Sequence, residues 1–294
     1  MKQGRLTPSA RGRVKILRGC PPSVAVAIGW ILLMGFVAVS VDFISPFDIK
    51  MTDLRARLLP PVFLEGGNWK HILGTDQLGR DTLSRLIYSI RTSMTIGLIS
   101  TLIAASIGIT LGFLAAHARG RTEQVILMLI DAQAAMPFII VALAVLAFFG
   151  NNLFLFTVLL GFYGWERIAR LVRGLAMSAN EQGFTIAVKD LGASPVRIYG
   201  LHVLPNVASS LIVAMTLNLP EVILLETGLS FLGLGVQPPL SSLGNMVGAA
   251  RDFLERAPSL VLIPSLVIML TALSISFVGD WLRDRTNPNA TSNR

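Results

Sequence analysis

Six long apolar segments alternate with shorter polar ones along this chain. The apolar segments cover residues 24–41, 94–116, 125–149, 153–168, 207–234 and 260–278. Most of them reach the roughly 17–25 residues that an α-helix needs to cross the hydrocarbon core of a membrane. The fourth is the weakest, because Tyr163, Trp165 and Glu166 dilute its end. The pattern predicts an all-α membrane protein with six transmembrane helices.

The polar stretch after the first apolar segment is long and mixed in charge. Within it Leu83, Leu86, Ile87 and Ile90 recur at helical spacing, which predicts an amphipathic helix at the outer membrane surface. Its apolar face would lie on lipid or pack against the protein's own spans. The expected divisions are an N-terminal segment 1–23, a first transmembrane helix 24–41, a loop 42–91, a core 92–282 with five transmembrane helices, and a tail 283–294.

Composition and charge agree with a membrane location. Hydrophobic residues make up 53% of the 294 residues, only 14% are charged, and the mean hydropathy is +0.66, whereas about a quarter of a soluble domain is charged. Six spans place sixteen of the 25 basic residues on one side and nine on the other. Basic loops mark the cytoplasmic side, so both termini are predicted to be cytoplasmic. The net charge of +8 is then a topology signal, with nucleic-acid binding a poor alternative.

The sequence shows no catalytic or metal-binding motif. Its three histidines are far apart, it has one cysteine, and it lacks a phosphate-binding P-loop. Ser230 lies in a Gly-Leu-Ser-Phe stretch that lacks the spacing of a G-x-S-x-G nucleophile turn. An intramembrane hydrolase using Ser230 therefore remains only an alternative to a small residue that lets helices approach closely.

A charged stretch, EQGFTIAVKDLGASPVRIYGLHVLPN at residues 181–206, interrupts the apolar pattern. Glu181 is expected at a helix start, and Gly192 at the left-handed cap that ends this helix. Ser194-Pro195 is typical of an N-cap followed by proline at the first helical position, and Pro205 is expected where the fifth span begins. A helix, a turn and a second helix could form a docking element or rest on the membrane surface. The spacing alone does not decide between the two.

Four motifs, in this order, carry a resemblance to a known family. They are HILGTDQLGRDTLSR at 71–85; Ile186-Ala187-Val188 with Gly192 and HVLP at 202–205; ETGLSFLGLGVQPP at 226–239; and GDWLRD at 279–284. The second resembles the EAA loop of binding-protein-dependent ABC importers. The others resemble C-type permeases of the dipeptide, oligopeptide and nickel group. The chain departs from the family at two positions of this loop: the family usually has Glu where this chain has Ile186, and Ala where it has Val188.

The resemblance implies a type I ABC importer permease fold, with a cytoplasmic coupling helix between the fourth and fifth transmembrane helices, in a loop at 175–205. It implies a bacterial inner-membrane location, a second homologous permease, two ATPase subunits that bind ATP and Mg, and an extracytoplasmic solute-binding protein. This chain itself would catalyse no reaction and bind no cofactor. The residues implied in docking to the ATPase subunits are Ile186, Ala187, Asp190, Leu191, Gly192, Ala193 and Ser194.

Several polar residues lie within the predicted spans, where a charge is costly and must face protein or water. Asn218 and Glu221 are candidates for lining a translocation path, with an interhelical hydrogen bond as the alternative reading. Glu226 is expected to be structural and Asp131 interfacial. Pro137 and Pro220 are expected to kink their helices.

The function expected from the sequence is a permease subunit of an ATP-driven importer of peptides or similar small polar solutes. An ion-coupled secondary transporter is the main alternative class. Dipeptides, oligopeptides, nickel chelates and opines all remain open as solutes.

Overall fold

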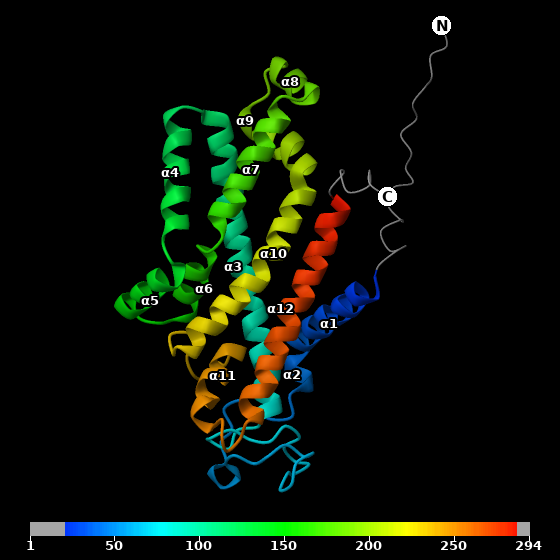
Figure 1. The fold of residues 1–294 in the computed structure, drawn as a ribbon, viewed down its shortest axis with the longest axis vertical. Helices are drawn as coiled ribbons and strands as arrows, with labels where there is room; N and C mark the ends of the chain where they lie inside the picture. Colours follow the sequence, from blue (N-terminus) through cyan, green and yellow to red (C-terminus); the bar gives the residue numbers. More distant parts are fainter. Residues whose placement is uncertain (1–20, 287–294) are drawn as a thin grey trace, which may run out of the picture.

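The protein is an elongated bundle of helices, shown in Figure 1 as a computed structural model that describes residues 21–286. The α-helices are α1 (Pro22–Val39), α2 (Val41–Ile44), α3 (Thr82–Ala118), α4 (Arg121–Ala135), α5 (Phe138–Phe149), α6 (Leu153–Gly161), α7 (Trp165–Asn180), α8 (Gly183–Asp190), α9 (Pro195–Arg197), α10 (Leu204–Phe231), α11 (Leu243–Ala250) and α12 (Ser259–Thr286). A π-helical turn (Ile198–Val203) joins α9 to α10, and 3₁₀ turns cover Leu54–Ala56 and Arg251–Phe253. The ends of the predicted terminal segments, 1–20 and 287–294, lie outside the described residues.

Four helical segments of the described chain are long and apolar enough to cross a membrane. They are α1, α3, α12 and the rod Pro195–Phe231, in which α9, the π-helical turn and α10 run together. A fifth candidate is the pair α4 and α5, which is bent by 87°. The structure therefore gives four spans, or five with the bent pair, where the sequence predicted six.

The predicted fourth span is divided between two helices. α6 ends at Gly161 and α7 begins at Trp165, with Gly164 at a φ of +85° between them. A Cβ at Gly164 would lie 2.1 Å from the side-chain oxygen of Asn218 on α10, and the φ of +85° would strain any residue that has a side chain. The break therefore falls at a left-handed glycine, which the apolar pattern does not reveal.

Proline breaks the predicted third span. Pro137 precedes the first residue of α5, and Met136 before it is extended, with φ −96° and ψ 130°. A residue before proline is disfavoured in the helical conformation, so the 87° bend falls at this point. By contrast, Pro220 lies inside α10, which continues through it.

The predicted amphipathic helix at 83–90 is not a separate element. Its residues form the first turns of α3, which continues for 37 residues without a break. Leu86, Ile87 and Ile90 are buried, and Leu86 and Ile90 belong to a core cluster with Met246 on α11 and Val267 on α12. The apolar face therefore packs against the protein's own helices.

α3 is the central helix of the bundle and contacts α1, α4, α6, α7, α10 and α11. Buried side chains gather in three clusters. One lies between α3, α4, α7 and the first part of the rod; one between α5, α6 and α10; and one between α1, α3, α11 and α12. In Figure 1, α8 lies at one end of the long axis and the irregular segment 45–81 at the other.

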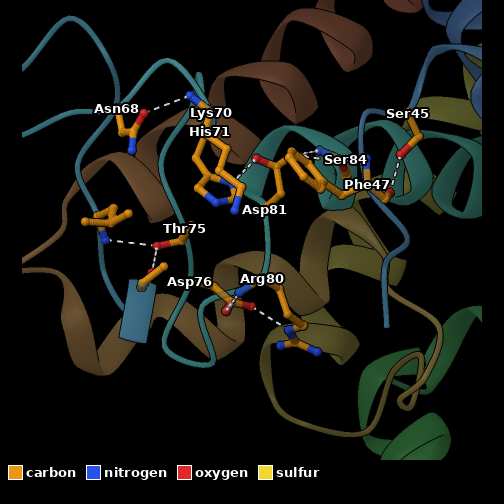
Figure 2. A network of polar contacts seen from close by, with 12 residues as sticks. Ser45, Phe47, Asn68, Lys70, His71, Thr75, Asp76, Arg80, Asp81 and Ser84 are labelled. Carbon is orange, nitrogen blue, oxygen red and sulfur yellow. Dashed lines mark hydrogen bonds and ion pairs between the residues drawn. The ribbon is translucent and has the colours of Figure 1, made fainter. Parts of the chain in front are cut away.

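The segment 45–81 is held to the start of α3 by buried carboxylates, as Figure 2 shows. Asp81 caps α3: its side chain accepts hydrogen bonds from the Ser84 amide and hydroxyl, both at 2.7 Å, and its other oxygen lies 3.0 Å from His71 Nδ1. Asp76 contacts the guanidinium groups of Arg80 at 2.7 Å and Arg85 at 2.5 Å. The polar residues of the motif at 71–85 thus build the end of the fold that lies opposite α8.

Candidate functional sites: an exposed docking loop and a polar cluster within the membrane

Residues 181–205, called the docking loop below after the role that the sequence predicts for them, contain α8, α9 and the turn between them, at one end of the molecule (Figure 1). α8 ends at Asp190, and Gly192 follows with a φ of +77°. The Ser194 hydroxyl then accepts the Arg197 amide at 3.4 Å, with Pro195 at the first helical position. The predicted left-handed glycine and the predicted N-cap are both confirmed.

Two details of the predicted hairpin are wrong. Glu181 is the C-terminal cap of α7, and Gln182 caps α8 instead. The second helix is not separate from the next span, because the rod Pro195–Phe231 is continuous through Pro205. Proline has no N–H to donate to the preceding turn, and just before it the chain adopts a π-helical turn in which the Leu204 amide bonds to Tyr199.

The tip of the docking loop exposes apolar side chains, whereas its base is buried. Leu191 is 86% exposed and Val196 is 83% exposed. Of the seven residues predicted to dock, six are exposed and Ala193 is partly buried. At the base, Thr185, Ile198 and Tyr199 are buried. Isolated exposed apolar residues are ordinary, but a group of them on a firmly anchored turn marks an interaction surface.

The second candidate site is an ion pair between α7 and α10. Arg167 contacts Glu221 through two parallel bonds, at 2.9 and 2.6 Å, the bidentate geometry that guanidinium and carboxylate groups favour. The Tyr163 hydroxyl donates to Glu221 at 3.1 Å, and Arg167 also lies 3.5 Å from the Asn218 side-chain oxygen. The structure therefore places Asn218 and Glu221, the two candidates from the sequence, in one cluster with Tyr163 and Arg167. Neither of these two residues was predicted to belong to the site.

The neighbours of this cluster fix its depth. Gly161 lies against Ile103 of α3, and Gly164, three residues on, lies against Asn218. Ile103 is midway along the apolar stretch 94–116, which at 1.5 Å per residue covers a hydrocarbon core of roughly 30 Å. The Arg167–Glu221 pair is therefore level with the middle of the apolar stretch of α3, yet its side chains are 50% and 42% exposed in this single chain.

Two further arginines of α7 also pair with carboxylates. Arg170 contacts Asp131 at 2.8 Å, and Arg173 contacts Glu123 at 2.8 Å, both on α4. With Arg167 they follow one another at three-residue intervals, which places them on one side of a helix. At the level of sequence these arginines were used only as evidence for the cytoplasmic side. Their three-residue spacing was the signal in the sequence that they could share one face of a helix and form ion pairs.

Glu226 is fully buried and has a structural environment, as predicted. It accepts hydrogen bonds from Ser93 at 3.1 Å and from Ser230 at 2.7 Å. Added Cβ atoms at Gly235 and Gly244 would lie 1.7 Å from Ser230 Oγ and 2.9 Å from its Cβ, so Ser230 is a small residue at a close contact. Its hydroxyl bonds to a carboxylate, with no histidine among its described partners. This environment favours packing over a hydrolytic nucleophile.

Within residues 21–286, no group of three or more His, Cys, Asp and Glu side chains is placed to hold a metal ion. The Asp76 and Asp81 carboxylates are instead engaged by arginine, histidine, serine and backbone donors.

Relatives of this chain are transport permeases. It is 39% identical over 259 residues to the di/tripeptide transport system permease protein DppC of Pseudomonas aeruginosa (strain UCBPP-PA14), covering 88% of this chain and 86% of that protein. It is 35% identical to the glutathione transport system permease protein GsiD of Pectobacterium atrosepticum, with 92% and 88% covered. It is 34% identical to the oligopeptide transport system permease protein OppC of Mycobacterium bovis, with 92% of each covered.

The fold is also found in a solved transporter. The inward-facing MetNI methionine ABC transporter, in its CY5 native crystal form, matches with a TM-score of 0.58 at 19% identity, over 70% of this chain and 98% of that one. Residues 108–291, more than half of the chain, match the family model of binding-protein-dependent transport system inner membrane components. The chain therefore belongs to this family: it is a multi-pass inner-membrane permease subunit of an ABC importer.

Proposed function

We propose that this permease carries peptides or similar small polar solutes into the cytoplasm, as half of a path that a second, homologous permease completes. Two ATPase subunits, which bind ATP and Mg, supply the energy, and an extracytoplasmic binding protein delivers the solute. The names of the relatives, which are di/tripeptide, glutathione and oligopeptide systems, support the solute class. The conclusion depends above all on the exposed apolar tip of the docking loop.

The docking loop seats in the ATPase subunits. Its surface offers Leu191, Ile186 and Val196 as apolar contacts, and Asp190 beside them as an exposed charge. Burial of apolar surface stabilises a complex by about 25 cal/mol for each Å² removed from water, so an apolar tip of this kind can anchor the loop in a partner. The family's usual Glu is absent at Ile186, so this interface depends more on apolar contacts than on an ion pair.

Gly192 permits a test of docking with a matched control. Gly192 and Gly120 both have positive φ, +77° and +70°, and a Cβ added at either would meet nothing within 4 Å. Valine at Gly192 carries a backbone strain of roughly 1–2 kcal/mol. Valine at Gly120, where ψ is −132°, is strained at least as much, but only Gly192 lies on the docking loop. Gly192→Val should insert into the membrane, co-purify with less ATPase subunit and lose peptide uptake, while Gly120→Val keeps both.

The readout is co-purification of the ATPase subunits, together with hydrolysis stimulated by loaded binding protein in reconstituted vesicles. Equal docking and stimulation by the two valine variants would refute the assignment of the loop. Ile186→Glu, which restores the family's usual residue, should be tolerated or should strengthen docking.

The path passes the mid-membrane cluster. An ion pair at that depth is too costly to face lipid, so the exposed sides of Arg167 and Glu221 face water or the second permease. We therefore assign Asn218 and Glu221, with Arg167, to the lining of the path. The pair offers both signs of charge to a solute that carries both.

Orientation follows from the same proposal. If α8 meets cytoplasmic ATPase subunits, the segment 45–81 at the opposite end is extracytoplasmic and both termini are cytoplasmic. The sixteen-to-nine division of basic residues supports this orientation.

A further inference from the structure

A cavity of about 320 Å³ lies at the base of the docking loop, where the ends of α3 and α7 meet α8 and the π-helical turn. Its lining includes His117 in the last turn of α3, Arg119 just after that helix, Glu181 after α7, Thr185 and Lys189 on α8, and Tyr199 on the π-helical turn. The path and the docking surface described above use neither this cavity nor its charged residues.

The cavity has an excess of positive charge. Arg119 and Lys189 have no ion-pair partner within residues 21–286. Glu181 is the acidic residue among those lining it. With His117 neutral, two cations and one carboxylate leave the lining with a net charge of about +1. Such a site attracts an anion, and its single carboxylate can accept a hydrogen bond from a donor on the same ligand.

Two neutral donors of the lining also lack an acceptor. The Thr185 side chain is 3% exposed, and its hydroxyl has no hydrogen-bond partner in the described structure. Tyr199 is buried, and its phenol oxygen accepts the Asn180 amide at 3.1 Å, which leaves the phenol hydrogen free to donate. A buried hydroxyl without a partner is destabilising, because it has lost its hydrogen bonds to water. An unpaired buried polar group of this kind indicates a missing ligand or water.

The cavity lies at the level of lipid headgroups. The apolar stretch of α3 ends at Ala116, and the cavity is lined by Ala116 itself and by His117 and Arg119, which come directly after it. Basic pockets between helices at the cytoplasmic surface are known sites for phosphate-bearing headgroups.

We propose that this cavity binds a phosphate group, with Arg119 and Lys189 as charged donors and Thr185 as a neutral donor. The phosphate can belong to an anionic phospholipid of the inner leaflet or to a soluble phosphate. Since Thr185 and Lys189 belong to α8, the bound phosphate ties the docking helix to the membrane-level end of α3. The site itself does not depend on which partner α8 docks.

The test uses the permease purified with its partner subunits, delipidated in detergent and titrated with phosphatidylglycerol, phosphatidylcholine or inorganic phosphate. Native mass spectrometry counts bound lipid, and equilibrium dialysis with radiolabelled phosphate measures the soluble anion. The variants are Arg119→Gln with Lys189→Gln, Thr185→Val, and Arg121→Gln as the control. Arg121 is exposed and lies two residues from Arg119, outside the lining.

Wild type should bind phosphatidylglycerol more tightly than phosphatidylcholine, whose choline neutralises its own phosphate. The double variant should bind the anion at least about tenfold more weakly, and Arg121→Gln should match wild type. Thr185→Val should weaken binding by about twofold to tenfold, as expected for one hydrogen bond. It should not lower the unfolding temperature of the ligand-free protein, because the hydroxyl has no protein partner to lose.

The two sources are separated by competition. Phosphatidylglycerol that stays bound in millimolar phosphate identifies the lipid, and displacement by phosphate identifies the soluble anion. Equal binding by wild type and the double variant, or an equal loss in Arg121→Gln, would overturn the proposal. Binding seen only after the ATPase subunits are removed would also overturn it, because a protein side chain would then fill the cavity in the complex.

Discussion

α3 and α7 pack closely at Gly108 and Gly112 of α3. Substituting either glycine by a residue with a side chain should push the two helices apart. A Cβ at Gly112 would lie 2.6 Å from Val172 Cβ and 2.7 Å from the Ala169 carbonyl oxygen. At Gly108 it would lie 2.8 Å from Ile168 Cβ. The four-residue spacing of the two glycines is the small-xxx-small pattern of close helix contacts in membranes.

The magnitude follows from these distances. Non-bonded carbon atoms prefer a separation of about 3.5–4.0 Å, so Gly112→Ala requires a displacement of roughly 1 Å. A backbone carbonyl cannot turn aside as a flexible side chain could, and forced overpacking costs about 1–3 kcal/mol. Alanine also favours a helix over glycine by about 0.5–1 kcal/mol. This gain partly offsets the cost and has to be measured separately.

Gly174→Ala measures that gain alone. Gly174 lies inside α7 on the exposed side, and a Cβ there would meet nothing within 4 Å. Gly112→Ala should therefore be less stable than Gly174→Ala by about 1–3 kcal/mol, or roughly 2–12 °C in unfolding temperature for a domain of this size. The assay is thermal unfolding of the purified complex in nanodiscs. An unfolding temperature for Gly112→Ala equal to or above that of Gly174→Ala would refute the reasoning.

Three other substitutions or fusions test the remaining assignments. Glu221→Gln leaves its arginine partner unneutralised, so uptake of a lysine-containing peptide should fall relative to a neutral peptide; an unchanged ratio in vesicles would favour a purely structural pair. A reporter active only outside the inner membrane should be active when inserted at Gly66 and silent after the last residue, and the reverse result contradicts the orientation. Asp76→Asn leaves Arg85 buried without its carboxylate and should cost about 3–5 kcal/mol by thermal unfolding, whereas Asp48→Asn, at an exposed site, should cost little; equal effects would contradict a structural role for Asp76.

Local chemistry was the most predictable part of this structure. Gly192 and Ser194-Pro195 were correctly assigned to a left-handed cap and an N-cap, because those roles depend on the residue's own backbone and near neighbours. The same holds for Pro137, which breaks its span. The burial of Glu226 was also foreseen, since a carboxylate in an apolar span needs protein partners.

Relations between distant residues could not be predicted in the same way. At the break before α7, Gly164 lies close to Asn218, which is 54 residues further along the chain, and no local pattern identifies that neighbour. The partner of Glu221 is Arg167, and nothing near either residue identifies the other. The apolar pattern reports only the length of an apolar segment. The sequence therefore predicted one span where the structure has α6 followed by the start of α7. The spacing of the arginines along α7 and of the glycines along α3 indicates that each set shares one face of its helix. Neither spacing identifies the helix that packs against that face.

α7 links the docking loop to the mid-membrane cluster, and the strengths of its contacts show how. Arg170–Asp131 is exposed, so it contributes about 1 kcal/mol at most, and Arg173–Glu123 is more buried. The apolar contact with α3 buries Ile168, Ala169, Val172 and Ala176 in a single cluster, and full burial of one large apolar side chain is worth about 1.5–3 kcal/mol. Packing on α3 therefore holds α7 in place. The ion pairs add contacts to other helices: Arg167 pairs with α10, and Arg170 and Arg173 pair with α4. α8 follows α7 directly across Glu181 and Gln182, so α7 is the covalent connection between the docking loop and the helix turn that carries Arg167.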